Sequence, residues 1–143
     1  MSPKVVLGNN VIVQSNVSIY DGVLCEDDVF FGPSVVLKNV INPRSAIIRK
    51  QEFKTTKIKK GASIGANATI VCGNTLGKYC FIGAGSVVVK DVPDYAIIIG
   101  NPGKQNGWMS EHGQRLIFDR EGNATCPATK TAYRLSEGKV TKI

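Results

Sequence analysis

Apolar residues recur at every sixth position along two stretches of this 143-residue chain, and this period restricts its fold more than any other feature. In the first stretch they are Leu7, Val13, Ile19, Cys25, Phe31 and Leu37, and in the second Ile58, Ile64, Ile70, Leu76, Ile82 and Val88. Four positions later lies a column of valine or smaller side chains: Val11, Val17, Val23, Val29, Val35, Ala62, Ala68, Asn74, Cys80, Ser86 and Val92. Neither the 3.6-residue period of a helix nor a simple alternation produces this spacing.

The fourth residue of each hexad is suited to a corner. Within the two stretches it is Gly, Asn, Asp or Ser everywhere except at Tyr79. Glycine, asparagine and aspartate tolerate the left-handed backbone conformation that a sharp corner needs. We therefore predict short flat strands joined by corners, with three hexads in each triangular coil and 18 residues per coil. A β-sandwich of short strands is the alternative, and the agreement of three columns argues against it.

An insertion interrupts the hexads, because Leu37 and Ile58 are 21 positions apart and 21 is not a multiple of six. We predict that it occupies residues 39–57. Long loops in compact domains are usually functional or disordered, and the apolar side chains of Ile47, Ile48 and Phe53 argue against disorder. A functional loop rooted at Asn39 is favoured over a tolerated surface excursion, although Asn39 alone also suits a simple turn.

The repeat ends after Val92-Pro93, which divides the chain into a coil over residues 1–99 and a tail over residues 100–143. We predict a last coil strand over 95–99 and a short helix over 105–115 that caps the open end of the coil, because an exposed coil end is an unpaired edge. Short strands are predicted over 116–118, 132–135 and 140–143, with a hairpin turn at 137–139. The expected fold class is thus all-β, a parallel β-helix with a protruding loop and a short helix and β tail.

Small residues recur along one edge of the predicted prism, because Gly65-Ala66, Gly83-Ala84 and Asn101-Pro102 lie 18 residues apart. Side chains this small leave a slot parallel to the coil axis, of the kind that an extended pantetheine arm needs. The alternative is that glycine here only eases the coil. Lys90 and Lys104 are candidates for the phosphates of such a ligand, although exposed lysines are usually only solvated.

Composition narrows the choice of chemistry further. The net charge of +7 suits binding of polyanions, including nucleotide-linked small molecules. The basic residues do not form a tract with interleaved aromatic residues, which argues against nucleic acid as the ligand. The four cysteines form no CxxC pair and the only histidine is His112, so we expect no metal site and no histidine base within the coil. Without an apolar stretch or leader-like start, we expect a cytoplasmic protein away from membranes.

Several segments resemble the UDP-2-acetamido-3-amino-2,3-dideoxy-D-glucuronate N-acetyltransferases. They are NPRS (42–45), KKGASIGANATIVCG (59–73), FIGAGSVVVKDVPDYAI (81–97), GNPGK (100–104), GWMSEHG (107–113) and ATCP (124–127). The resemblance covers nearly the whole chain, and its tail segments are the specific part. Members usually carry further coils before the position that matches Val6, and alanine is usual where Gly103 stands. The related dTDP-3-amino-3,6-dideoxyhexose N-acetyltransferases share the coil and an NPRS-like loop.

The resemblance implies a left-handed coil and a homotrimer that binds acetyl-CoA and a UDP-linked amino sugar between subunits. It implies transfer of the acetyl group to the 3-amino group of the sugar, for bacterial surface polysaccharides such as O-antigen, without a metal. Asn39 is then the catalytic, substrate-positioning residue. Arg44 is the candidate partner of the uronate carboxylate or diphosphate, and Tyr20 and Asp21 are weaker substrate candidates. If acetyl-CoA occupies the slot inferred above from the spacing, the predicted cofactor residues are Gly65, Ala66, Gly83, Ala84, Lys90, Pro102 and Lys104. The alternatives are another nucleotide-linked amino sugar, such as a dTDP-3-amino-3,6-dideoxyhexose, and a non-catalytic trimer.

Overall fold

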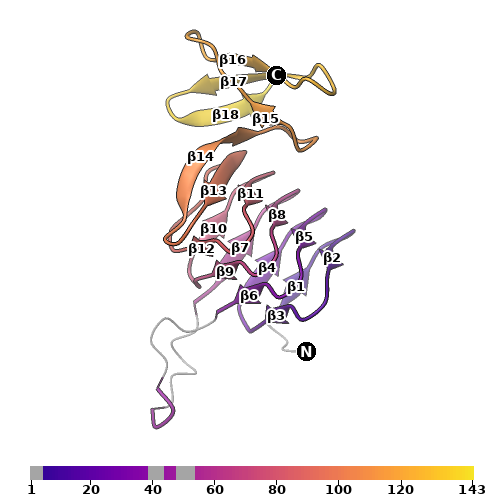
Figure 1. Ribbon diagram of the computed structural model, residues 1–143. Helices are drawn as coiled ribbons and strands as arrows, with labels where there is room; N and C mark the ends of the chain where they lie inside the picture. Colours follow the sequence, from indigo (N-terminus) through magenta and orange to yellow (C-terminus); the bar gives the residue numbers. More distant parts are fainter. Residues whose placement is uncertain (1–4, 39–43, 48–53) are drawn as a thin grey trace.

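The computed structural model describes residues 5–38, 44–47 and 54–143, and all regular structure in these residues is β-strand (Figure 1). Three parallel sheets form the faces of a triangular coil. Sheet A contains β1 (Val6–Leu7), β4 (Val23–Cys25), β7 (Thr56–Ile58) and β10 (Thr75–Leu76). Sheet B contains β2 (Ile12–Val13), β5 (Phe30–Phe31), β8 (Ser63–Ile64), β11 (Phe81–Ile82) and β13 (Ala96–Ile99). Sheet C contains β3 (Ser18–Ile19), β6 (Val36–Leu37), β9 (Thr69–Ile70) and β12 (Val87–Val88).

The strand register confirms the predicted coil of 18 residues. Val6 pairs with Leu24, Ile12 pairs with Phe30, and Ser18 pairs with Val36, each 18 positions apart. Across the insertion, Leu24 of β4 pairs with Lys57 of β7. Because β7 begins at Thr56, the coil resumes slightly earlier than the predicted end of the insertion at residue 57.

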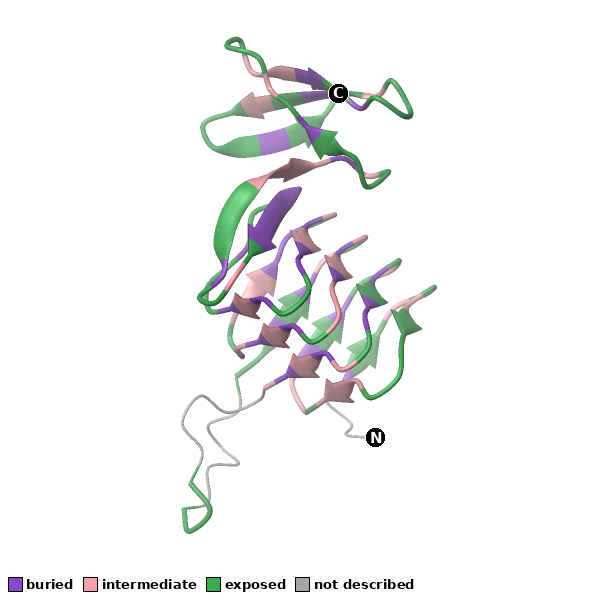
Figure 2. Ribbon diagram, viewed as in Figure 1, coloured by how far each residue is buried: buried purple, intermediate pink, exposed green. Residues whose placement is uncertain are grey.

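The predicted inward columns form the core (Figure 2). From the second coil onward, every first-position residue from Cys25 to Val88 is buried. In the lowest described coil, Leu7 and Val13 are 39% and 43% exposed, since no described coil lies beneath them. Stacking of one coil on the next therefore supplies the burial that no single coil achieves.

The corners also follow the prediction. Every fourth-position residue from Asn10 to Gly85 has a positive φ, including Tyr79 at 54°, and only Asp91 is not among them. Tyr95 reaches the same conformation at 64°. A bulky side chain in this region is unusual, so these two tyrosines indicate a local constraint, which the tail explains below.

The predicted capping helix over 105–115 is wrong. Lys104–Met109 is strand β14, which pairs antiparallel with β13 through Ile98–Gln105 and Ala96–Trp108, and β15 (Arg115–Leu116) adds one more strand. The open edge of β13 offers unpaired backbone groups, and pairing with β14 satisfies them. Gly107 also disfavours a helix at this point. The coil end is thus closed by strands.

The rest of the tail is a small antiparallel sheet of β16 (Asn123–Thr125), β17 (Ala132–Ser136) and β18 (Lys139–Lys142), drawn above the coil in Figure 1. It confirms the strands predicted near 132–135 and 140–143 and the turn at 137–139, whereas β16 was not predicted. Trp108 packs against both the coil core and the tail core. Sheet B continues across residues 99–100, and the division of the chain into two domains there stays a prediction.

Candidate active site

The edge between sheets B and C carries the predicted small residues, and we call residues 65–66, 83–84 and 101–102 the Gly–Ala edge. Successive coils approach closely here: the Gly65 N–H donates to the Ile82 carbonyl and the Gly83 N–H to the Ile98 carbonyl, both at 2.8 Å. A Cβ on Gly65 would lie 2.6 Å from the Ala84 backbone nitrogen. Glycine at position 65 is therefore required for coil stacking, which supports the structural alternative without excluding a slot.

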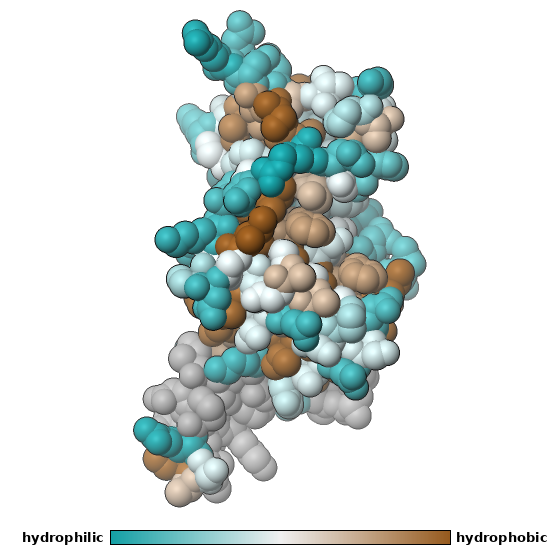
Figure 3. Space-filling view, in the orientation of Figure 1, coloured by the Kyte–Doolittle hydropathy of each residue, from teal (hydrophilic) through white to brown (hydrophobic). Residues whose placement is uncertain are grey.

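The outer surface of this edge remains low and accessible. Ala66 is half-buried and Ala84, Asn101 and Pro102 are exposed, while Lys104 begins β14 just beyond the turn. Hydrophobic surface gathers where the upper coil meets β14 (Figure 3), and Ile99 at the end of β13 is 45% exposed there. Three hollows lined by described residues lie elsewhere, beside sheet A and under the tail. Among the described residues, the Gly–Ala edge lines none of these hollows.

The edge between sheets C and A carries the predicted substrate residues, and we call it the insertion edge. Tyr20 and Asp21 follow β3 on this edge, and Lys38 follows β6 at the root of the insertion. Lys90 follows β12 in the same hexad position as Asp21, so the structure places it on the insertion edge and apart from the other predicted cofactor residues. Asn39, the predicted catalytic residue, lies outside the described residues.

Arg44 lies in a short described turn of the insertion, where it forms an isolated antiparallel bridge with Ile47. Both residues are exposed, and Figure 1 draws this turn away from the coil. Within one chain, the candidate residues are therefore distributed over two edges that border sheet C. The structure brings Tyr20, Asp21 and Lys90 to one edge and the glycine and alanine pairs to the other.

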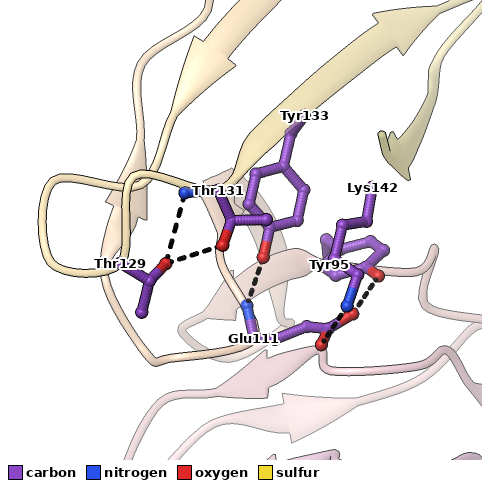
Figure 4. Close-up of polar contacts among 6 residues, drawn as sticks. All are labelled: Tyr95, Glu111, Thr129, Thr131, Tyr133 and Lys142. Carbon is purple, nitrogen blue, oxygen red and sulfur yellow. Dashed lines mark hydrogen bonds and ion pairs between the residues drawn. The ribbon is translucent and has the colours of Figure 1, made fainter.

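The third edge, between sheets A and B, holds the tail in place (Figure 4). The rings of Tyr79 and Tyr95 stack with centroids 5.8 Å apart, and Tyr133 of β17 meets Tyr95 edge-on at 5.5 Å. The Tyr95 hydroxyl donates to Glu111 at 2.9 Å, and the Glu111 N–H donates to the Tyr133 hydroxyl at 3.0 Å. Sequence reasoning missed this cluster, although Tyr79 was the one bulky residue at a predicted corner.

Burial and hydrogen bonding tune the groups of this cluster. Burial, and then the hydrogen bond to Glu111, raise the pKa of Tyr95 well above its usual range. The hydrogen bond to Glu111 raises the pKa of Lys142, whose ammonium lies 3.2 Å from that carboxylate. At neutral pH Tyr95 is therefore protonated and Lys142 charged, so both side chains can donate to the Glu111 carboxylate.

His112 lies exposed beside this cluster, in a hollow lined with Thr129, Thr131 and Tyr133. It follows β14 in the tail and stands on neither candidate edge of its own chain.

The four cysteines are buried and unpaired. Cys25 and Cys80 occupy inward positions of the repeat, as predicted, and burial raises their pKa values to about 11 and about 12. At neutral pH these two thiols are protonated and behave as small apolar groups.

Comparison with known proteins finds relatives that are named as acetyltransferases. The chain is 45% identical over 93 residues to dTDP-3-amino-3,6-dideoxy-alpha-D-galactopyranose 3-N-acetyltransferase of Aneurinibacillus thermoaerophilus, which covers 65% of this chain and 47% of that protein. It is 32% identical over 100 residues to the galactoside O-acetyltransferase of Lactococcus lactis, with coverages of 66% and 48%. The chain thus spans about half the length of these relatives. No family model matches the sequence.

Solved structures give the same picture. A hexapeptide-repeat acetyltransferase of Vibrio cholerae, complexed with acetyl-coenzyme A, superposes with a TM-score of 0.68 at 26% identity and covers 76% of this chain and 62% of that one. A maltose O-acetyltransferase of Clostridium difficile gives 0.67 at 27% identity, covering 76% and 60%. The left hand of the coil, which only the family resemblance predicted, is confirmed. By repeat, fold and sequence, the chain belongs to the superfamily of hexapeptide-repeat, left-handed β-helix proteins that contains these acetyltransferases.

Proposed function

We propose that the protein is an acetyl-CoA-dependent N-acetyltransferase that acts on the 3-amino group of a dTDP-linked 3-amino-3,6-dideoxyhexose. The observation that carries the proposal is the 45% identity to an enzyme named for that reaction. The intact Gly–Ala edge on the same coil supports it, and an acetyltransferase with acetyl-coenzyme A bound shares this fold. The expected UDP-linked uronate is therefore the second choice of substrate.

The reaction needs little from a protein base. The sugar amine attacks the thioester carbonyl of acetyl-CoA and forms a tetrahedral intermediate, whose oxyanion a backbone N–H stabilises. The C–S bond then breaks, the amine nitrogen loses a proton, and CoA leaves as the thiol. An amine on an electron-poor sugar ring loses its proton more readily than an alkyl amine. Asn39 orients this amine, and water relays the amine proton to the departing CoA sulfur.

The active site forms between subunits of a homotrimer. Within one chain the Gly–Ala edge and the insertion edge are separated by the full width of sheet C. A neighbouring subunit that brings its insertion edge against the Gly–Ala edge joins the two halves. Exposed apolar side chains on the outer faces, such as Ile12 and Phe30 of sheet B, suit burial in such an interface.

The UDP-linked 2-acetamido-3-amino-2,3-dideoxy-glucuronate is the second candidate because of the tail. The segments GWMSEHG (107–113) and ATCP (124–127) resemble those of the enzymes that act on that sugar. In the structure both segments belong to the tail and its dock against the coil, through Trp108 and Cys126. These segments therefore support the resemblance as parts of the tail fold, and they are not argued to contact the substrate.

The test is a thiol-release assay with acetyl-CoA and matched dTDP- and UDP-linked 3-amino sugars. Turnover with a dTDP-linked 3-amino-3,6-dideoxyhexose and little with the uronate supports the first candidate, and the reverse preference moves the choice to the second. Absence of turnover with the whole panel, in a folded protein, leaves only the non-catalytic trimer. Light scattering on the same sample measures the trimer directly.

A further inference from the structure

Ser86 is a polar residue at an inward position of the repeat, whereas the residues at the same corner of the lower coils, Val17, Val35 and Ala68, are apolar. It stands 18 positions after Ala68 and its side chain is 0% exposed. A hydroxyl in such a place costs free energy unless it forms a hydrogen bond. Its Oγ accepts a hydrogen bond from the Gly100 N–H at 3.1 Å. Ser86 therefore links the coil interior to the first residue of the turn at the top of the Gly–Ala edge.

The turn over residues 100–103 takes the place that a further strand of sheet C would occupy above β12. The Val87 N–H donates to the Gly100 carbonyl at 2.9 Å, and the Gly103 N–H donates to the Val87 carbonyl at 2.8 Å. These two bonds fix the ends of the turn. The Gly100 N–H points to the coil interior, and Ser86 provides its acceptor.

Asn101 and Pro102 are carried by this turn and form the last rung of the Gly–Ala edge. The turn belongs to no strand. The position of these two exposed residues relative to Ala84 therefore depends on the hydrogen bonds at Gly100 and Gly103. Gly103 is buried, and a Cβ there would lie 2.7 Å from the Ile98 side chain. The turn is thus tightly packed at Gly103, whereas at Gly100 it is held by the hydrogen bonds with Val87 and Ser86.

We propose that Ser86 is a positioning residue for acetyl-CoA: its Oγ holds the Gly100 N–H and so sets the position of Asn101 and Pro102 along the pantetheine slot. The inference rests on the proposed function, since it assigns the slot to CoA. Ser86 touches neither substrate. It acts through the turn, so its loss changes the binding of CoA and leaves the binding of the amino sugar unaffected.

The test compares S86A, S86C and V35A, a control that removes volume from the same inward column two coils below. S86A removes the acceptor, and S86C replaces it with a sulfur that accepts hydrogen bonds weakly. We expect the Kd for CoA, measured by calorimetry without any sugar, to rise about tenfold in S86A and less in S86C. The KM for acetyl-CoA should rise in parallel, with the KM for the sugar unchanged. V35A should lower the melting temperature and keep the CoA affinity of the wild type.

Wild-type CoA affinity in folded S86A overturns the inference, and so does an equal loss of affinity in V35A. If S86A does not fold, the Kd of S86C decides, and a wild-type value there overturns it. These outcomes are separate from failure of the proposed function. If the wild-type protein does not bind CoA, the assignment of the slot to CoA is wrong. If it binds CoA normally but transfers acetyl to no sugar, only the proposed reaction is wrong.

Discussion

The Gly–Ala edge and the insertion edge border the same sheet and follow the same hexad numbering, yet they are built differently. On the first, small residues bring successive coils together so closely that a single added Cβ at Gly65 meets backbone atoms at 2.6 Å. On the second, the equivalent places hold Tyr20, Asp21 and Lys90, and the chain leaves the coil at its insertion. The comparison shows that one repeat supplies both a closely packed edge of small residues and an edge with larger polar side chains.

The largest expected effect tests the insertion edge. Asn39→Ala should lower kcat about a hundredfold, because a misplaced amine loses the alignment that the reaction needs. The KM for acetyl-CoA and the trimer mass should not change. The measurement is steady-state thiol release, with Thr125→Ala on the exposed side of the tail as control. An unaltered kcat would remove Asn39 from the site.

Mixed trimers test whether the two edges of different subunits meet. Ala84→Trp fills the slot of the Gly–Ala edge and Asn39→Ala disables the insertion edge, so each homotrimer should be nearly inactive. Random reassembly of equal amounts should restore about a quarter of wild-type activity, since each ring interface joins unlike edges of neighbouring subunits. If both edges serve one site within a single chain, mixing restores nothing.

Stability should distinguish two glycines on the same edge. Gly65→Ala places a methyl 2.6 Å from the Ala84 backbone nitrogen. A Cβ at Gly83 would come no nearer than 3.3 Å to the Ile99 side chain, with the Ile98 carbonyl oxygen and the Ser86 Oγ at 3.4 Å. We expect Gly65→Ala to lower the free energy of unfolding by about 3 kcal/mol and Gly83→Ala by less than about 1 kcal/mol. Chemical denaturation of both variants checks this. Equal losses would show that the coils yield at position 65.

Arg44 provides a smaller test of acceptor recognition. Arg44→Ala should raise the KM for the nucleotide sugar about tenfold, by removing charge-assisted hydrogen bonds to an anionic group. Arg44→Lys should recover part of the loss, and the KM for acetyl-CoA should stay constant. A change in the KM for acetyl-CoA alone would indicate that Arg44 contacts the cofactor and not the nucleotide sugar.

Substitution of Lys90 or Lys104 by alanine should give the smallest change in KM and tests where the phosphates of the cofactor bind. Lys104 lies at the end of the Gly–Ala edge and Lys90 on the insertion edge. Each substitution by alanine should raise a KM about threefold at low salt, and less as salt is added. For Lys104→Ala that constant is the KM for acetyl-CoA. Lys90→Ala shows which substrate lies against the insertion edge, and Lys57→Ala on the outer face of sheet A is the control.

The coil and its corners were predictable because each contact repeats. A residue in the first or fourth hexad position meets its counterpart 18 residues away, so a local pattern carries the tertiary contact. The edge on which Lys90 lies was also contained in that numbering, since Lys90 and Asp21 occupy the same hexad position. The hexad position predicts the edge on which Lys90 lies but not the ligand that it contacts, so the grouping of Lys90 with the cofactor residues does not follow from the repeat.

The tail was predictable only in part. Its later strands and the turn at 137–139 follow from local signals, but the helix over 105–115 was wrong because the open edge of β13 selected a strand at Lys104–Met109. The dock through Tyr79, Tyr95 and Tyr133 joins residues from three separate parts of the chain. No short-range pattern specifies such contacts.

The sequence by itself determined the hexad period, the inward columns and the small residues of the Gly–Ala edge. Only the tertiary structure decided that the coil end is closed by strands, that the tail rests on the third edge, and that Ser86 accepts a hydrogen bond from the turn at the top of the Gly–Ala edge. The physical reason is the range of the contacts. Within the repeat, the residues in contact are a fixed number of positions apart, so the sequence period predicts them. The end of the coil has no further repeat above it, and its contacts are made by more distant parts of the chain.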